Sequence, residues 1–444
     1  TSRYHSVFKD GNIFRMYYRG SQINLTKEKL IDTHPFYICY AESTDGIHWK
    51  KPELNLCEFN GSKKNNIILA SGAIGDIQLN MGDNASMFKD ENPAASSDAR
   101  YKAIVCSAKP KGLFAFKSSD GIHWLPMTKK PIITAGAFDS QNIAFWDSIN
   151  NEYRAYWRYF KSGTSESTLT TGGIRAVRTA VSKDFIHWTQ IKDISYSDSQ
   201  AIQLYTNQVK PYFRAPQILL GIPTRYIEKG WSPSMRALPD LKHRKLRSSH
   251  SLRYGTALTD AMLMTSRNGT EFERWEESFL RPGIERNGTW NYGQQYVAWG
   301  IVETKSELNG APNELSFYAT ENSWTSEAPT SDLRRYTLRL DGFVSVQAPM
   351  SGGEIITKPL KFKGHILSLN FATSVAGEIL VEVQDENGKA IEGFELKDCY
   401  PVFGDTTERT VIWKNGSNLI NLAGREVRLR FVLKDADLYS FQFQ

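Results

Sequence analysis

The stretch Ser43-Thr44-Asp45-Gly46-Ile47-His48-Trp49 decides the fold, because the chain repeats it. It recurs as Ser118-Ser119-Asp120-Gly121-Ile122-His123-Trp124 and, less closely, as Ser182-Lys183-Asp184-Phe185-Ile186-His187-Trp188. A fourth copy, Ser266-Arg267-Asn268-Gly269-Thr270, is followed by Phe272 and Trp275. An Asp-Gly or Asn-Gly pair between strand-like segments is typical of a tight turn. The repeat therefore predicts a series of similar β-units, with its histidine capping or packing the turn.

Three strand-like segments precede each turn and a short one follows it, which makes four strands per unit. The preceding segments are 6–8, 14–18 and 37–41; 85–88, 101–105 and 113–116; 143–146, 153–159 and 174–180; and 208–211, 217–222 and 261–265. A fifth unit follows from 296–302, 314–319 and 334–340. Radially repeated four-stranded units are blades. We therefore predict an all-β chain with a five-bladed β-propeller over residues 1–350.

The repeat stops after about Gly352, and the remaining sequence has a different pattern. Segments 354–362, 366–372, 377–385, 410–414 and 427–433 alternate apolar and polar residues, with Gly and Asn turns between them. This pattern is typical of a β-sandwich. We predict an accessory sandwich over residues 351–444.

Composition excludes several classes of protein. The net charge of +6 is modest for 444 residues, and the one basic block, 242–247, is interpreted as a solvated loop, so no nucleic-acid partner is expected. No apolar run is long enough to span a membrane, and no leader peptide is visible after Thr1. The four cysteines lack metal-binding or disulfide spacing, which predicts buried free thiols.

The most informative polar stretch is Phe138-Asp139-Ser140-Gln141-Asn142, which directly precedes the first strand of the third unit. It places one carboxylate and two amides at the head of an apolar strand. If the first strands line the centre of a propeller, Asp139 lies at its mouth.

The turns, the strand units and the trailing sandwich resemble the five-bladed propeller glycoside hydrolases of families 32 and 43, and most closely uncharacterised bacterial family 32-like proteins. The resemblance covers most of the chain. It implies three carboxylates at the starts of three inner strands, because glycoside hydrolysis needs a proton donor and a nucleophile or base.

The match to those carboxylates is partial. Asp139 occupies the place of the family's acid, where the family more often has Glu. In the second unit Asn84 stands where an Asp is expected, with Asp83 beside it. The first unit offers Tyr4 or His5, and the fourth offers Asn207 and Gln208, so the usual set is not reproduced.

The same geometry predicts which other side chains reach the mouth. Second strands would end there with Arg19, Arg158 and Arg225, and third strands would begin there with Arg175 and Asp260. We therefore predict Asp139, Asp260 and Asp83 as catalytic residues. The predicted substrate-binding residues are Arg19, Asn84, Asn142, Arg158, Arg175, Asn207, Gln208 and Arg225. Arginine binds carboxylate, sulfate or vicinal hydroxyls through paired donors. The structural alternative is that these arginines pair with Asp139 and Asp260.

The favoured function is an exo-acting glycosidase for a plant or algal polysaccharide fragment. A non-catalytic carbohydrate-binding propeller is the alternative, and a protein-interaction propeller is disfavoured because such repeats are shorter. No cofactor is required, no metal ligands are predicted, and a structural cation in the channel is left open. The resemblance implies a secreted or periplasmic bacterial protein; the sugar, the stereochemical outcome and the oligomeric state stay open.

Overall fold

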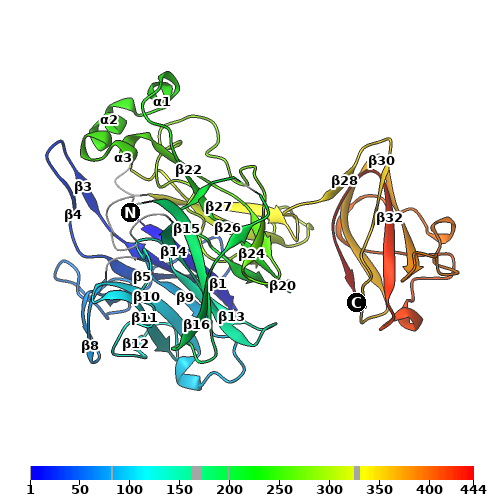
Figure 1. Cartoon of the computed structure of the whole chain (residues 1–444), viewed down its shortest axis with the longest axis horizontal. Coiled ribbons are helices and arrows are strands. Elements are labelled where there is room, and N and C mark those ends of the chain that lie inside the picture. Colours follow the sequence, from blue (N-terminus) through cyan, green and yellow to red (C-terminus); the bar gives the residue numbers. More distant parts are fainter. Residues whose placement is uncertain (1, 82–83, 162–172, 199, 325–330) are drawn as a thin grey trace. The chain divides into compact units, whose positions relative to one another are not determined.

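Strands dominate the computed structural model, which describes residues 2–81, 84–161, 173–198, 200–324 and 331–444 (Figure 1). The prediction of a mainly β chain is confirmed. The chain divides into two compact units, one comprising Thr1–Val302 with Ser316–Tyr336 and the other Glu303–Leu315 with Thr337–Gln444. The domain limits 1–350 and 351–444 stay a prediction. No helix in the described ranges is long and apolar enough to cross a membrane.

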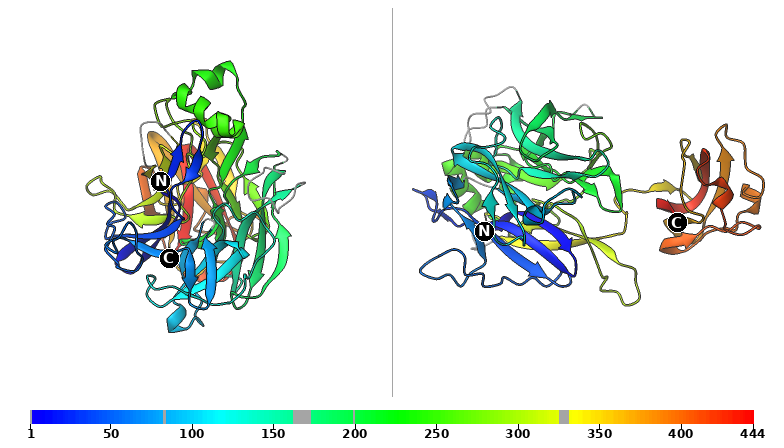
Figure 2. Two further views of the ribbon diagram at one scale, coloured as in Figure 1. Left: turned by 90° about the vertical axis from the view of Figure 1, so that its left-hand side faces the viewer. Right: turned by 90° about the horizontal axis from the view of Figure 1, so that it is seen from below.

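The first half of the first unit forms three antiparallel sheets (Figures 1 and 2). The first sheet has the order β1 (Ser2–Asp10), β2 (Ile13–Gly20), β5 (Tyr37–Ser43) and β6 (Ile67–Ala70). The second contains β7 (Gly72–Ile74), β8 (Ile77–Met81), β9 (Ser86–Lys89), β10 (Tyr101–Lys109), β11 (Lys111–Ser118) and β12 (Leu125–Pro126). The third has the order β13 (Ile143–Asp147), β14 (Glu152–Lys161), β15 (Ile174–Ser182) and β16 (Trp188–Asp193).

The later strands form further sheets and one hairpin. A fourth sheet has the order β17 (Ser195–Tyr196), β24 (Glu271–Arg274), β23 (Met264–Ser266), β20 (Ala215–Gly221) and β19 (Lys210–Tyr212). Beside it in sequence lies a three-stranded sheet of β18 (Gln203–Leu204), β21 (Thr224–Glu228) and β22 (Ala257–Ala261). The fifth predicted unit corresponds to β25 (Val302–Thr304), β26 (Glu314–Glu321) and β27 (Asp332–Arg339). The hairpin is β3 (Ile23–Leu25) with β4 (Leu30–Asp32).

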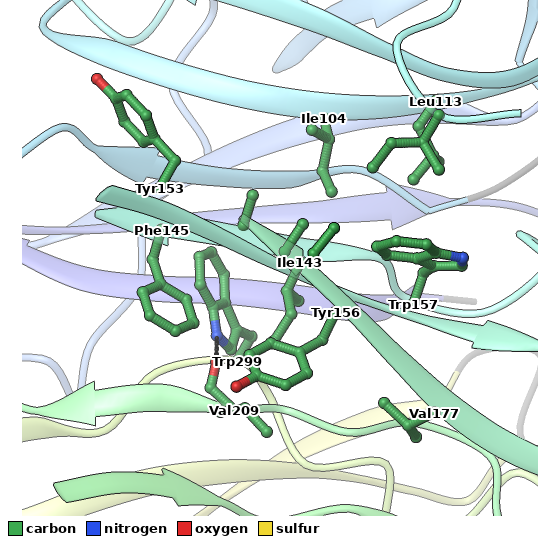
Figure 3. Close-up of a cluster of buried hydrophobic side chains, with 14 of the residues drawn as sticks. Ile104, Leu113, Ile143, Phe145, Tyr153, Tyr156, Trp157, Val177, Val209 and Trp299 are labelled. Atoms are coloured by element: carbon green, nitrogen blue, oxygen red, sulfur yellow. Dashed lines mark hydrogen bonds between the residues drawn. The ribbon is translucent and has the colours of Figure 1, made fainter. Parts of the chain in front are cut away.

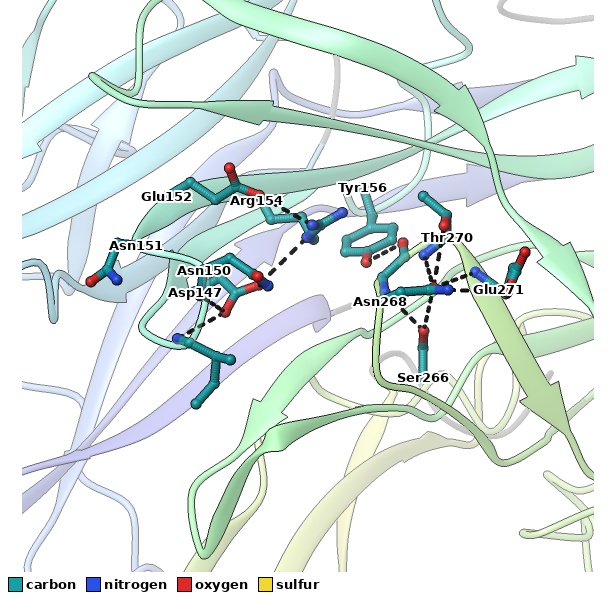
Figure 4. Close-up of polar contacts among 12 residues, drawn as sticks. Asp147, Asn150, Asn151, Glu152, Arg154, Tyr156, Ser266, Asn268, Thr270 and Glu271 are labelled. Atoms are coloured by element: carbon teal, nitrogen blue, oxygen red, sulfur yellow. Dashed lines mark hydrogen bonds and ion pairs between the residues drawn. The ribbon is translucent and has the colours of Figure 1, made fainter.

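The repeated turns share one hydrogen-bonding scheme. In the second copy Asp120 Oδ1 accepts the backbone N–H groups of Ile122 at 2.8 Å and His123 at 2.9 Å, and His123 Nδ1 lies 2.7 Å from Asp120 Oδ2. The first and third copies repeat these contacts, so the prediction that the histidines cap the turns is confirmed. In the fourth copy Asn268 Oδ1 accepts the same two N–H groups, from Thr270 and Glu271 (Figure 4).

Hydrogen bonds join each sheet of the first unit to the next and the last to the first. The bonds run from Tyr17 to Gly121 O, Tyr153 to Asp90, Tyr156 to Gly269 O, Trp299 to Val209 O, and Tyr318 to Gly46 O. Backbone bonds between Val7 and Trp299 (2.8 Å) and between Trp299 and His5 (2.7 Å) also join the two ends of the unit. The contacts therefore form a closed series.

The core of the first unit is assembled from several sheets at once. Ile104, Ile143, Tyr156 and Trp299 are at most 1% exposed and belong to one cluster (Figure 3). The indole of Trp299 donates to Val209 O at 2.9 Å, which satisfies a polar group that burial would otherwise leave without a partner. Apolar packing thus fixes the strand β13, and polar residues stand directly before it in the sequence.

Helices interrupt the chain between β21 and β22, where the sequence predicted a solvated loop. They are α1 (Pro233–Ala237), α2 (Leu241–His250) and α3 (Leu252–Thr256). The loop interpretation of block 242–247 is wrong, because Arg244 and Arg247 are fully buried on α2. Arg244 donates to the carbonyls of Pro239 and Trp290, and Arg247 donates to Asn291 Oδ1. Protein groups therefore accept part of the hydrogen bonds of these two charges, while Arg244 Nη1, Arg247 Nε and Arg247 Nη1 have no acceptor among the described residues.

The second unit has its own core. Its main sheet contains β28 (Val346–Ala348), β29 (Gly353–Ile356), β30 (Leu367–Asp385), β31 (Asp405–Thr410) and β32 (Val427–Phe443). Leu369, Val381, Trp413 and Leu429 are fully buried within it. All four cysteines of the chain are free; Cys57 is half-buried and the other three are buried.

Candidate functional site

Asp139 lies in the loop directly before β13, where its side chain is 30% exposed. Asn142 holds the loop in shape, because its amide donates to Phe138 O at 2.9 Å and to Ser140 O at 2.8 Å. Gly136 is required at the loop start, since a Cβ there would lie 2.6 Å from both Phe138 and Trp157. The loop is thus built to present one carboxylate.

Arg158, on β14, is the partner of this carboxylate. Its Nη2 donates to Asp139 Oδ1, and the guanidinium is 2% exposed. Its Cζ lies 4.8 Å from the centre of the Tyr205 ring and 5.2 Å from that of Phe160. An adjacent guanidinium favours the ionised form of a carboxyl in general.

Arg175, on β15, approaches the same tyrosine from a second direction. Its Cζ lies 5.6 Å from the Tyr205 ring centre and 3.9 Å from that of Tyr226. Its Nη1 donates to the neutral amide oxygen of Gln203 at 2.7 Å. Arg175 is also 2% exposed, so two buried cations flank one phenol.

Tyr205 is the tyrosine of the site whose pKa is lowered. Burial raises its pKa, but Arg158, a hydrogen bond from Tyr292, Arg175 and a hydrogen bond involving Tyr4 together lower the pKa to about 6. The charges of Arg19 and Arg253 also interact with Tyr205. Burial raises the pKa of Tyr4, Tyr292 and Tyr296, and the charge at Tyr205 raises it further.

These groups form what we call the Arg–Tyr cluster. Its members come from most parts of the first unit, and Arg158 connects them to the carboxylate of Asp139. They are Arg3, Tyr4, Arg19, Arg158, Arg175, Tyr205, Tyr226, Arg253, Tyr292 and Tyr296.

Arg19 and Asn84 join this cluster from the first and second sheets. Arg19 donates to Asn84 Oδ1 at 3.3 Å, and its Cζ lies 5.0 Å from the ring centre of Tyr4. Asp32, at the end of β4, was not predicted. Partial desolvation raises the pKa of its carboxyl even though Arg19, His34 and Arg3 lower it, while the residue as a whole remains exposed.

Asn207 and Gln208 lie deeper, in a network of amides between the inner strands. Gln208 Nε2 donates to Gln141 Oε1 at 2.9 Å and to Val297 O at 2.6 Å. Gln141 in turn donates to Ser6 Oγ at 3.2 Å, and Asn207 Oδ1 accepts from the N–H of Val209. Gln208 therefore joins segments that are distant in sequence, whereas the Asn207 contact is local.

In four of the five predicted units, a non-glycine residue within two residues of the start of the predicted first strand has the left-handed backbone conformation. These residues are Tyr4, Asn84, Gln208 and Gln295, with φ values of 55°, 55°, 51° and 54°. The conformation disfavours side chains, and residues held in it cluster at functional sites. The left-handed conformation therefore recurs at a similar place in four of the five predicted units.

Asp260 and Arg225 lie apart from the Arg–Tyr cluster. They form a two-pronged ion pair of 2.8 and 2.5 Å on the paired strands β21 and β22. Tyr226 points into the cluster, and neighbouring side chains on a strand point to opposite faces. Arg225 and its partner Asp260 therefore lie on the other face of this sheet from Tyr226. Asp83 lies outside the described residues.

The sequence did not single out the loop that supplies Tyr292 and Tyr296. Its residues Trp290-Asn291-Tyr292-Gly293-Gln294-Gln295-Tyr296 precede the first strand of the fifth unit. The reasoning that selected Asp139, namely polar residues at the head of an inner strand, would have found them. Arg244 and Arg247 of α2 fix this loop through Trp290 O and Asn291 Oδ1.

Metal ligands are not apparent at this site. Within the described ranges no group of three or more His, Cys, Asp or Glu side chains is arranged to hold an ion.

Comparisons with known proteins give similar structures but no family. No protein-family model matches the sequence, and no curated protein matches it. An N-acetylgalactosamine deacetylase from F. plautii gives a TM-score of 0.44 at 13% identity, covering 76% of this chain and 88% of that one. An endo-arabinase from Bacteroides thetaiotaomicron gives 0.43 at 10%, covering 76% and 93%. A β-fructofuranosidase from Schwanniomyces occidentalis gives 0.38 at 12%, covering 99% and 94%. At these values the site has to be argued from its own geometry.

Proposed function

We propose that this chain is a glycoside hydrolase whose active site is the Arg–Tyr cluster around Asp139. In this proposal the five sheet groups of the first unit are the blades of a propeller, and the second unit is a β-sandwich. The closed series of hydrogen bonds from the first sheet to the fifth and back supports the ring. Polar residues at the heads of the inner strands would then share one mouth.

The observation that carries the proposal is the accessible carboxylate of Asp139 on Arg158, whose guanidinium lies beside the Tyr205 ring. A glycosidase needs a carboxylate beside the scissile bond and flat apolar surfaces against which a sugar ring packs. Asp139 is 30% exposed, and Tyr205, Tyr292 and Tyr296 lie in the same cluster. No cofactor enters this chemistry.

The two catalytic roles need carboxyls in different protonation states. Arg158 favours the ionised form of Asp139, so Asp139 suits the nucleophile or base. Asp32 is our candidate for the acid, because desolvation raises the pKa of its carboxyl and its charge interacts with Arg19 and Arg3 of the cluster. Asp260 and Asp83 remain the alternatives for this second role.

We further propose that the enzyme acts on chain ends of a plant or algal polysaccharide. The support is a barrier beside the cluster, formed by the β3–β4 hairpin and the α2–α3 segment. His250 Nε2 of α2 lies 2.6 Å from Thr26 O of the hairpin, and Arg253 of α3 borders Tyr292. A secreted or periplasmic location would suit such a substrate.

The test is sugar release from a panel of polysaccharides by the wild type, Asp139→Asn and Asp193→Asn. Asp193 is the matched control, because it pairs with Arg178 at 2.7 Å in the same sheet but outside the cluster. We expect Asp139→Asn to lower turnover by about 10²–10⁴-fold, the range for loss of an acid–base group. Asp193→Asn should retain wild-type turnover. Near-normal turnover by Asp139→Asn would show the assignment to be wrong.

A carbohydrate-binding propeller without catalysis is the second candidate. It is favoured by the fact that Asp139 and Asp260 are both held by arginine. Under this alternative the wild type binds oligosaccharides but releases no sugar from any member of the panel.

A further inference from the structure

Arg158 and Arg175 are two buried cations with little anionic compensation. Arg158 has one carboxylate partner, Asp139, bonded through Nη2 alone. Arg175 has the neutral amide of Gln203 as its side-chain partner. Both guanidinium groups are within 6 Å of the Tyr205 ring centre, at 4.8 and 5.6 Å. Like charges held this close in a buried site repel one another unless an anion lies between them.

Several donors of these two arginines have no acceptor. Arg158 Nε and Nη1 and Arg175 Nε are buried and lack a hydrogen-bond partner among the described residues. A buried N–H of a charged group without an acceptor costs more than a neutral one. An anionic ligand oxygen would supply the missing acceptor, and its charge would take the place of the Tyr205 phenolate beside the two arginines.

A cavity of about 460 Å³ adjoins Arg175, and Arg158 is not among the residues that line it. Arg175, Gln203 and Tyr226 line it, and its volume lies in the range of small-molecule sites. Glu228 also lines it, and this carboxylate accepts the Tyr226 hydroxyl at 2.8 Å. The cavity thus presents a cation and an aromatic ring together, which suits a ring-shaped ligand that carries an acid group.

We propose that the site recognises an acidic sugar, whose carboxylate or sulfate group is bound by Arg158 and Arg175. The inference rests on the proposed function in taking the ligand to be a carbohydrate. Guanidinium binds both anions through paired, charge-assisted hydrogen bonds, so the shared feature is a negatively charged, planar or tetrahedral oxyanion. Asp139 then stays on the remaining donor of Arg158, beside the sugar.

The test compares binding of matched sugars by titration calorimetry. The probes are glucuronate with glucose, galacturonate with galactose, glucose 6-sulfate, and oligosaccharides of each type. The variants are Arg175→Gln and Arg178→Gln, which remove the same charge from the same strand, but Arg178 faces Asp193 outside the cluster. We expect the wild type to bind an acidic probe roughly tenfold or more tightly than its neutral partner, the value of one charged hydrogen bond. Arg175→Gln should lose this preference, and Arg178→Gln should keep it.

Several results would overturn the proposal. Equal affinity of the wild type for acidic and neutral partners would do so, and this arm needs no variant to fold. The proposal would also be wrong if folded Arg175→Gln still preferred acidic over neutral sugars. It would likewise be wrong if the wild type bound none of the acidic probes. Comparison of glucuronate and galacturonate with glucose 6-sulfate shows whether the site binds a carboxylate or a sulfate group. Calorimetry measures binding without turnover, so the two proposals can fail separately. Binding of an acidic sugar without any hydrolysis would contradict only the proposed glycosidase activity. Hydrolysis of neutral sugars would contradict only the proposal that the ligand is acidic.

Discussion

The repeated turns and the Arg–Tyr cluster are opposite kinds of structure within the same unit. Each turn is closed by residues that are neighbours in sequence, such as Asp120 with Ile122 and His123, and the scheme recurs almost unchanged. The cluster takes one or two residues from each of several sheets and repeats nothing. The hydrogen-bonding scheme of the turn therefore recurs from sheet to sheet. The Arg–Tyr cluster, in contrast, consists of different residues contributed by different sheets.

The largest effect is expected in the cluster, from the titration of Tyr205. Its pKa of about 6 predicts a phenolate absorbance signal several pH units below that of ordinary tyrosine, which titrates near pH ~10. The signal should vanish in Tyr205→Phe and persist in Tyr226→Phe, since burial raises the pKa of Tyr226. Ultraviolet difference spectra between about pH 5 and 8 provide the measurement. If no tyrosine ionises in that range, the charge assignment at Tyr205 is wrong.

The sign of the accompanying stability change follows from the lowered pKa. The folded pKa lies below the unfolded one, so the phenolate's contribution to stability is fully present above pH ~10 and is lost as the pH falls through about 6. The difference in unfolding free energy between wild type and Tyr205→Phe should therefore grow with pH. The phenolate also competes with an acidic ligand for Arg158 and Arg175, so affinity for that ligand should fall as the pH rises through the same range.

A smaller effect is expected where a turn meets its neighbouring sheet. Gly121 has a φ of +79°, and a Cβ there would lie 2.7 Å from the Tyr17 hydroxyl and 2.9 Å from Arg15 Nη1. Gly61 has almost the same φ, +78°, with nothing within 4 Å. Gly61→Ala should cost about 1–2 kcal/mol from conformation alone. Gly121→Ala should cost about 2–4 kcal/mol, because crowding adds to the strain. Chemical denaturation measures both values. An equal loss of unfolding free energy in the two variants would show that the Tyr17 and Arg15 side chains move aside at no cost.

Within one turn, the carboxylate should matter more than the histidine. Asp120→Ala removes the acceptor of two backbone N–H groups and should lower the unfolding free energy by about 1–2 kcal/mol. His123→Ala removes an exposed ion pair and should cost less than about 0.5 kcal/mol. A histidine effect equal to that of Asp120 would mean that the ring, rather than the carboxylate, organises the turn.

The same contrast explains how far the sequence could be interpreted. The turns and the strands around them follow from Asp-Gly pairs and alternation, which are local signals. Asp139 and its place before β13 could also be predicted, because the head of an inner strand is defined by the repeat. Tyr292 and Tyr296 were not selected although they also precede the first strand of a predicted unit; the shape of their loop depends on Arg244 and Arg247, which are distant in sequence. Arg244 and Arg247 belong to a charged block, so the sequence predicted that water solvates them. The protein groups that accept their hydrogen bonds come together only in the tertiary structure.

The left-handed residues near the starts of four predicted first strands have an evolutionary consequence. Glycine would occupy such positions without strain, whereas Tyr4, Asn84, Gln208 and Gln295 each carry a penalty of about 1–2 kcal/mol. A chain selected for stability alone would drift toward glycine at these places. Under the proposed function, these four side chains lower the stability of the fold but contribute to the site. Variants that gain thermal stability by substitution at these positions should therefore most readily lose function.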